Sequence, residues 1–180
     1  YHDILYYHKM SQFNLKNNIH RKKLYLNKEN FLLNAGSKII DDKLQFIKKK
    51  LDACLFLDIP IGLKNKKLIN AEICAVKDID KVNKEFSGIF SNFSTQITFE
   101  NNLEESLKSI YKKLEKDGLF CFNLLTPNSM RTISNIFIEI DENIFNGAYN
   151  RFGPFHDISN IIERLNYHNF KEIVVSTDFI

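Results

Sequence analysis

The sequence predicts a single α/β domain, and two observations lead to this fold class. Its 180 residues, 44% of them hydrophobic, are enough for one core and too few for two. From residue 53 onward, short apolar runs typical of buried strands alternate with longer segments of helical periodicity. That alternation is the pattern of a sheet covered by helices. We therefore expect one domain over residues 1–180, with a helical N-terminal segment at 1–50 and an α/β core at 51–180.

The first predicted elements lie on either side of residue 50. Residues 28–50 place apolar side chains three and four positions apart, which predicts an amphipathic helix. Residues 53–58 form a continuous apolar run closed by an acid and a proline, as in a strand buried on both faces. Residues 71–76 predict a second short strand, and the charged stretch after them predicts a solvent-exposed connection.

The middle of the chain predicts a strand, a helix and a strand. Residues 86–95 form an apolar run that ends in small polar residues, and residues 100–118 carry the apolar stripe of a helix. The acids of this helix fall in its first turn and its lysines in its last, which matches the helix dipole. Gly118 stands where a left-handed helix cap is expected. Residues 118–126 then predict another buried strand.

Three further elements complete the predicted domain. Residues 130–145 predict a helix, which Asn128 or Ser129 would cap. Residues 157–170 predict a shorter helix capped by Asp157. Residues 171–179 contain alternating apolar positions, which predicts a final strand.

Composition argues against several functional classes. The net charge of +3 is too small for nucleic-acid binding, which needs a dense field of Lys and Arg along one face. Cys54, Cys74 and Cys121 are odd in number and lie in apolar runs, which indicates buried thiols rather than disulfides or a metal site. No apolar run reaches the roughly 20 residues of a membrane span, and the first ten residues lack the features of a secretory signal. We expect a cytoplasmic protein, or a mitochondrial-matrix one if the source is eukaryotic.

Two basic clusters, Arg21–Lys23 and Lys48–Lys50, are each flanked by helix-like sequence. A solvated helix face explains them without any partner. Contact with an acidic protein is the alternative.

The C-terminal half of the chain carries three segments that together resemble a known family. They are IFSNFSTQI at 89–97, NNLEESLKSIYKKLEKDGLFCFNLL at 101–125, and the stretch from NGAYNRF to the end at 146–180. They resemble class I S-adenosylmethionine methyltransferases, in particular the family of the malonyl-acyl-carrier-protein methyltransferase of biotin synthesis and the related mitochondrial complex I assembly factor. Residues 114–118 are similar to the turn that leads into the fifth strand of that family. The resemblance implies a Rossmann-like sheet.

The resemblance also implies a glycine-rich turn after the first strand, which holds the methionine and ribose of S-adenosylmethionine. The matching string keeps Asp58 and Gly62, but Pro60 and Lys64 replace the first and last glycines. Proline fixes φ and has no N–H to donate, and lysine adds bulk where glycine lets the backbone approach a ligand. We therefore expect a degenerate cofactor turn.

The stretch from that turn to Phe86 is short for the family. Only about 28 residues separate Asp58 from Phe86, and each crossover between parallel strands needs about a dozen. The sheet is therefore predicted to be truncated between its first and fourth family strands, with at least one helix and one strand missing.

The remaining candidate site residues follow from the same resemblance. Glu72 is the acid nearest the position that would bind the cofactor ribose, and Asn92 matches a position that faces cofactor and substrate. Capping of its own strand end is the alternative for Asn92. Tyr149, Arg151 and His156 fall in the loop on the substrate side, where they would position a carboxylate or an acidic carrier protein, or lie at the surface without a function.

Three functions remain open. The favoured one is a methyltransferase-like protein of the biotin-synthesis type with a degenerate S-adenosylmethionine site. It would act by binding another protein through Lys48–Lys50 and the exposed loop that contains Tyr149, Arg151 and His156. The second is an active S-adenosylmethionine-dependent O-methyltransferase that acts on malonyl-acyl-carrier protein. The third is a small α/β binding module unrelated to methyl transfer. Methyl transfer needs proximity and orientation rather than an acid or a base, so no catalytic residue is assigned.

Overall fold

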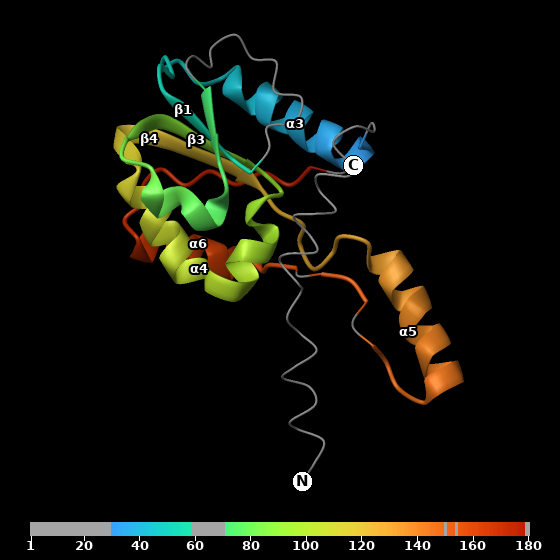
Figure 1. Cartoon of the computed structure of the whole chain (residues 1–180). Helices are drawn as coiled ribbons and strands as arrows, with labels where there is room; N and C mark the ends of the chain where they lie inside the picture. Colours follow the sequence, from blue (N-terminus) through green and yellow to red (C-terminus); the bar gives the residue numbers. More distant parts are fainter. Residues whose placement is uncertain (1–29, 59–70, 150, 154, 179–180) are drawn as a thin grey trace.

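Four parallel strands form the centre of the chain (Figure 1), in a computed structural model that describes residues 30–58, 71–149, 151–153 and 155–178. The sheet has the order β2-β1-β3-β4. The strands are β1 (Cys54–Leu57), β2 (Ala71–Cys74), β3 (Phe86–Asn92) and β4 (Leu114–Asn123). The helices are α3 (Phe31–Leu44), the 3-10 helix η1 (Val76–Lys81), α4 (Thr95–Lys112), α5 (Arg131–Phe145) and α6 (Ile158–Tyr167). The predicted α/β class is confirmed.

The two central strands, β1 and β3, are buried along their whole length. Both pair in parallel, with Cys54 opposite Gly88 and Phe56 opposite Phe90. A strand that is covered on both faces carries apolar residues on both, which explains the uninterrupted apolar runs in the sequence. The prediction of buried strands at 53–58 and at 86–95 is confirmed, although β3 ends three residues earlier than expected.

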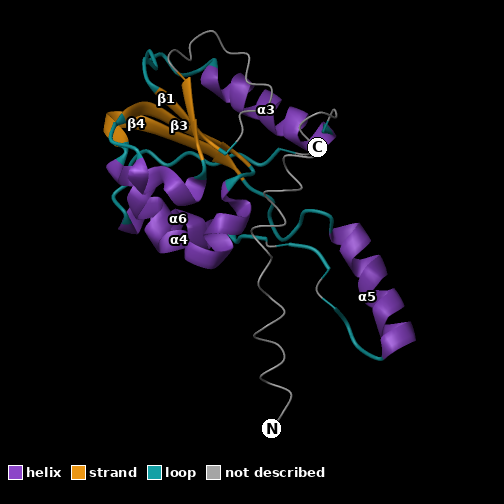
Figure 2. Ribbon diagram, in the orientation of Figure 1, coloured by secondary structure: helices purple, strands orange, loops and turns teal. Residues whose placement is uncertain are grey.

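Helices cover both faces of the sheet (Figure 2). On one face, Ile40 and Leu44 of α3 pack against a core cluster that includes Cys54, Phe56 and Phe90. On the other face, side chains of η1, α4 and α6 form a second cluster around Leu55, Leu57 and Ile89; it includes Ile79, Leu107, Ile110, Ile161 and Leu165. The predicted helix at 28–50 is confirmed over 31–44.

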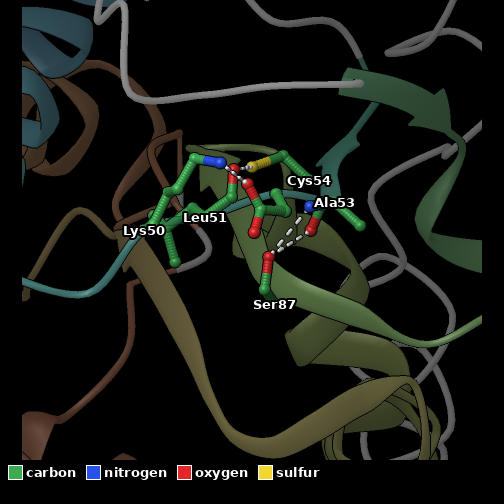
Figure 3. A network of polar contacts seen from close by, with 6 residues as sticks. Lys50, Leu51, Ala53, Cys54 and Ser87 are labelled. Atoms are coloured by element: carbon green, nitrogen blue, oxygen red, sulfur yellow. Dashed lines mark hydrogen bonds and ion pairs between the residues drawn. The ribbon is translucent and has the colours of Figure 1, made fainter.

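Hydrogen bonds fix the start of β1 to β3 (Figure 3). The backbone N–H of Ala53 donates to Ser87 Oγ at 3.0 Å, and the Ser87 hydroxyl donates to the Ala53 carbonyl at 2.9 Å. Next to them, Lys50 forms an ion pair with Asp52 at 2.8 Å. The two Ala53–Ser87 bonds join the strands at the amino end of the sheet, whereas the Lys50–Asp52 pair is a local surface contact.

The helix predicted at 100–118 begins earlier and has two segments. α4 starts at Thr95 and is interrupted at Asn102, whose backbone is not helical. The Asn102 side-chain amide donates to the Glu105 carboxylate at the start of the second segment. Of the predicted acids, Glu104 and Glu105 therefore lie after the kink and Glu100 before it, and the first turn of the whole helix has none.

The predicted cap at Gly118 is wrong. α4 already ends at Lys112, and β4 begins at Leu114. The left-handed conformation is found instead at Asp117, the residue before Gly118, with φ of 60°. Gly118 is needed for space instead, because a Cβ there would lie 2.9 Å from the Glu115 carbonyl.

The two later helices are confirmed, but only one of their predicted caps is. The N-cap of α5 is Met130, which has left-handed φ and ψ and makes no side-chain capping bond. The Ser129 hydroxyl instead accepts a bond from the Thr126 N–H within the preceding turn, so the cap predicted at 128–129 is wrong. Asp157 caps α6 as predicted, by accepting from the Ser159 N–H at 3.4 Å.

Residues 171–178 are not a strand, and this prediction is wrong. Glu172 has a positive φ of 53°, which breaks an extended conformation at the start of the segment. Ile173 packs against the core, but Val174 is 90% exposed. The segment ends near α3, where Asp178 lies 3.7 Å from the Lys43 amine.

The connection from β1 to β3 agrees with the predicted truncation. In its described part, one short strand (β2) and one turn-like helix (η1) take the place of the longer crossover that the resemblance implies. Residues 59–70 lie outside the described residues. No described helix is both long enough and apolar enough to cross a membrane.

The three cysteines are free thiols. Cys54 is buried, whereas Cys74 and Cys121 are half-buried, so the prediction of buried thiols is confirmed fully for Cys54 alone. Burial raises the pKa of Cys121 to about 11. This thiol is therefore neutral near pH 7.

Candidate functional site

The carboxyl ends of parallel strands are where ligands bind in open α/β sheets. Here that edge is formed by Leu57 at the end of β1, Asn92 at the end of β3 and Asn123 at the end of β4. Asp58 follows β1 directly, with a positive φ of 63°, and its backbone N–H donates to the Cys74 carbonyl at 2.6 Å. Gly62, the second residue that the resemblance assigns to the cofactor turn, lies outside the described residues.

Asn92 is buried and its side chain is bonded to α3. The amide nitrogen donates to the Leu33 carbonyl at 2.8 Å and to the Ser37 hydroxyl at 2.9 Å. The side-chain oxygen of Asn92, Oδ1, accepts a hydrogen bond from Asn123 Nδ2 at 3.1 Å. Asn123 Oδ1 in turn accepts one from the Phe93 N–H at 2.7 Å. This network joins the ends of β3 and β4 to the first half of α3.

The contact is close because α3 presents a glycine to it. A Cβ on Gly36 would overlap Asn92 Oδ1 and would lie 2.5 Å from the Phe93 ring and 2.7 Å from Asn123 Nδ2. No side chain fits between helix and strand ends at this point. The helix backbone therefore lies directly against Asn92, the residue at this point that the resemblance implies would face the cofactor.

Glu72 lies inside β2 rather than after its carboxyl end. It stands opposite Leu55 in the register, two residues before the last residue of the strand. Its carboxylate accepts a hydrogen bond from Lys84 Nζ at 2.7 Å, and both side chains are near half exposed. The structure therefore places this acid in a surface ion pair.

Arg151 and Tyr149 lie together against α5. Arg151 Nε donates to Asp141 Oδ2 at 2.8 Å, and Arg151 Nη2 donates to Asp141 Oδ1. The Arg151 guanidinium also lies 5.6 Å from the Phe137 ring centroid and 5.9 Å from that of Tyr149. The hydrogen bond from Arg151 is the main reason that the pKa of the Asp141 carboxyl is below its usual range.

His156 lies elsewhere, at the start of α4. Its Nε2 is 2.6 Å from the Gln96 carbonyl oxygen, so this nitrogen carries the proton and donates. Its ring meets Phe99 edge-on at 6.2 Å. The Gln96 side chain bonds both backbone groups of Leu125, at 2.7 Å and 3.1 Å. His156 therefore helps to hold the segment that follows β4.

Apart from Asp58 after β1, the structure thus separates the described site residues into four places. Asn92 faces α3, Glu72 faces Lys84, Arg151 with Tyr149 faces α5, and His156 faces Gln96. Among the described residues, no group of His, Cys, Asp and Glu side chains is arranged to hold a metal ion. The bonds observed for Asn92, Arg151 and His156 join one part of the fold to another.

Sequence reasoning missed two contributors to this region. Nothing in the local sequence indicates the role of Gln96, because its two hydrogen bonds to Leu125 join residues 29 positions apart. The apolar stripe of α5, by contrast, is visible in the sequence. Apolar residues three and four positions apart run through 133–144, and several of these side chains are exposed.

Comparison with known proteins finds distant likenesses among solved structures. No protein-family model and no curated protein matches the chain. Among solved structures, it is similar to the phosphoethanolamine N-methyltransferase 2 of Haemonchus contortus in complex with phosphomonomethylethanolamine and S-adenosylhomocysteine, with 12% identity and a TM-score of 0.39. The match covers 59% of this chain and 28% of that one. A likeness at this level assigns no activity, and the α/β class rests on the sheet itself.

Proposed function

We propose that this chain is a methyltransferase-like protein of the biotin-synthesis type, with a degenerate S-adenosylmethionine site, and that it acts by binding another protein. The observation that carries the proposal is the contact of α3 with the carboxyl edge of the sheet. The Asn92 amide bonds Leu33 and Ser37, and Gly36 lies against it. A cofactor that used Asn92 would have to displace α3 and break these bonds. The substitutions at Pro60 and Lys64 add to this argument.

The proposed partner is an acidic protein of the carrier-protein class, and the proposed contact surface lies around Lys48–Lys50. All three lysines are exposed, and Phe46 beside them is 81% exposed. Lys49 Nζ donates to the Asp117 carbonyl at 2.8 Å, which holds the cluster beside the first half of β4. A group of amines next to an exposed aromatic ring suits a partner with acidic side chains around an apolar patch.

The cofactor half of the proposal is tested by calorimetric titration of the full chain with S-adenosylmethionine. We expect no heat of binding and no rise in melting temperature at millimolar cofactor. A cofactor that bound the native state would raise its stability, so the melting temperature is a direct check. Micromolar affinity would contradict the degenerate site. Formation of a methyl ester on malonyl-acyl-carrier protein, detected by mass spectrometry, would establish the active O-methyltransferase instead.

The partner half is tested by titration with an acidic acyl carrier protein. We expect binding that Lys48→Glu weakens several-fold and that added salt weakens further, since the attraction is between exposed charges. Lys112→Glu is the matched control, because Lys112 is an exposed lysine on α4, which covers the other face of the sheet. Absence of binding by the unmodified chain, or equal loss in both variants, would rule out this surface.

A further inference from the structure

One side of α5 carries an apolar stripe that the described part of the chain leaves open. Five side chains recur three and four positions apart and therefore share one face of the helix: Ile133, Ile136, Phe137, Ile140 and Ile144. They are between 37% and 65% exposed. Figure 1 shows α5 standing away from the sheet and from the helices that cover it. A stripe of this kind is typical of a helix that packs against another segment.

A neighbouring side of α5 is already occupied by the segment that follows it. The buried Asp141 carboxylate pairs with Arg151, the Phe152 ring lies 5.5 Å from Phe137, and the Tyr149 ring lies 5.8 Å from Phe145. These contacts fix the orientation of the helix. They reach the edge of the stripe at Phe137 and, among the described residues, leave its four isoleucines free to receive a further segment.

We propose that residues 1–29 of the same chain cover the apolar stripe of α5. Residues 1–29 join the described fold at Asn30, which caps α3 by accepting from the Leu33 N–H at 3.1 Å. Leu33 is bonded to Asn92, and Asn92 to Asn123 at the end of β4, from which the chain continues to α5. The N-terminal segment and α5 therefore meet the sheet at the same edge.

The segment is long enough to reach the whole stripe. Fully extended, 29 residues span up to about 100 Å. The 15 residues of α5 measure only about 22 Å. Even if the N-terminal segment were entirely helical, as its sequence predicts, its length would be about 43 Å, roughly twice that of α5.

Composition and charge of the segment suit α5. Twelve of its 29 residues are apolar: Tyr1, Ile4, Leu5, Tyr6, Tyr7, Met10, Phe13, Leu15, Ile19, Leu24, Tyr25 and Leu26. It carries six Lys or Arg against two Asp or Glu. On α5, Glu139 and Glu142 stand against Arg131, which leaves a small negative excess, since the charge of Asp141 is already paired with Arg151. Opposite charges around an apolar contact favour this pairing and disfavour one between like segments.

A second copy of the chain is the less suitable occupant. A stable interface between two proteins buries about 800 Å² on each partner. Five half-exposed side chains on one short helix supply much less apolar surface than that. A segment of the same chain does not need so large a contact, because the covalent link raises its effective concentration at the stripe.

Photo-crosslinking of the full chain tests this proposal. A photoreactive benzoyl-phenylalanine placed at Ile140 is expected to crosslink to residues 1–29 within one molecule, identified by peptide mass spectrometry of the monomeric product. The matched control carries the same group at Asn135, an exposed residue on the opposite side of α5, and is expected to crosslink to that segment several-fold less. Crosslinks between two copies, crosslinks from Ile140 to residues 30–178, or equal yields at both positions would overturn the proposal.

Hydrogen exchange gives a second test that does not depend on a bulky probe. Ile140→Asp in the full chain is expected to raise the exchange rate of amides in residues 1–29 at least several-fold, whereas Asn135→Asp leaves it unchanged. The amides of β3 report whether each variant is folded. An unchanged rate in residues 1–29 of a folded Ile140→Asp variant would contradict the proposal, whatever the cofactor and partner titrations give.

Discussion

At the scale of single residues, Gly36 is the position on which the contact between α3 and the sheet depends. An alanine Cβ would overlap Asn92 Oδ1 and would come within 2.7 Å of Asn123 Nδ2. The helix would have to move away and loosen the bonds that Asn92 makes to Leu33 and Ser37. We expect Gly36→Ala to lower the free energy of unfolding by about 1–3 kcal/mol, measured by urea denaturation.

Gly147 supplies the control for this measurement. A Cβ at that position meets no atom within 4 Å, and Gly147 is not among the residues with positive φ. Gly147→Ala is therefore expected to leave the free energy of unfolding unchanged or to raise it by up to about 1 kcal/mol. The gain would come from the lower conformational entropy of the unfolded chain. If the two variants were equally stable, the close contact at Gly36 would not exist in solution.

At the scale of elements, residues 171–178 differ from the strand that their alternating pattern predicts. Ile173 packs against the core while Val174 is almost fully exposed and makes no sheet pairing. We expect Val174→Lys to change the free energy of unfolding by less than about 0.5 kcal/mol. Ile173→Lys should lower it by about 1–3 kcal/mol, because a charged amine replaces a packed side chain. A comparable loss in both variants, in thermal and urea unfolding, would indicate a paired strand after all.

The sequence predicted most elements well because their signals are local. The stripe of α3, the buried runs of β1 and β3, and the Asp157 cap of α6 each lie within a few neighbouring residues. Residues 171–178 carry the local pattern of a strand, but a strand also needs a neighbouring strand whose backbone groups are available for hydrogen bonding. That condition depends on the tertiary structure, so the sequence alone does not contain it.

The candidate site was harder to predict for the same reason. The bonds of Asn92 to Leu33 and Ser37 join positions 59 and 55 residues apart, and nothing in the local sequence announces them. Family resemblance placed Asn92 at the correct edge of the sheet but could not show that α3 lies against it. The Asp141–Arg151 pair, ten residues apart, was similarly hidden, because neither a substrate-side role nor a bare surface position for Arg151 indicates a bond to α5.

At the scale of the whole molecule, the chain is held together in two different ways. The sheet and its covering helices rest on two buried clusters of apolar side chains. α5 and the segment that follows it are joined instead by the Asp141–Arg151 ion pair and by ring contacts at the surface. The first kind of contact is insensitive to protonation, and the second contains a carboxylate that must be ionised. The two parts should therefore respond differently to acid.

Acid is expected to release the segment after α5 before it unfolds the sheet. The hydrogen bond from Arg151 lowers the pKa of Asp141 in the folded protein. The stabilisation from this pair is thus complete above the ordinary carboxyl pKa of about 4 and is lost as the pH falls through the lowered value. In NMR spectra, the contact between the Phe137 and Phe152 rings should weaken below about pH 4, while that between Phe56 and Phe90 in the core persists.

Arg151→Gln should already weaken the contact between the Phe137 and Phe152 rings at neutral pH and remove most of its pH dependence. Simultaneous loss of both ring contacts on acidification would show instead that the segment after α5 and the sheet unfold as one unit.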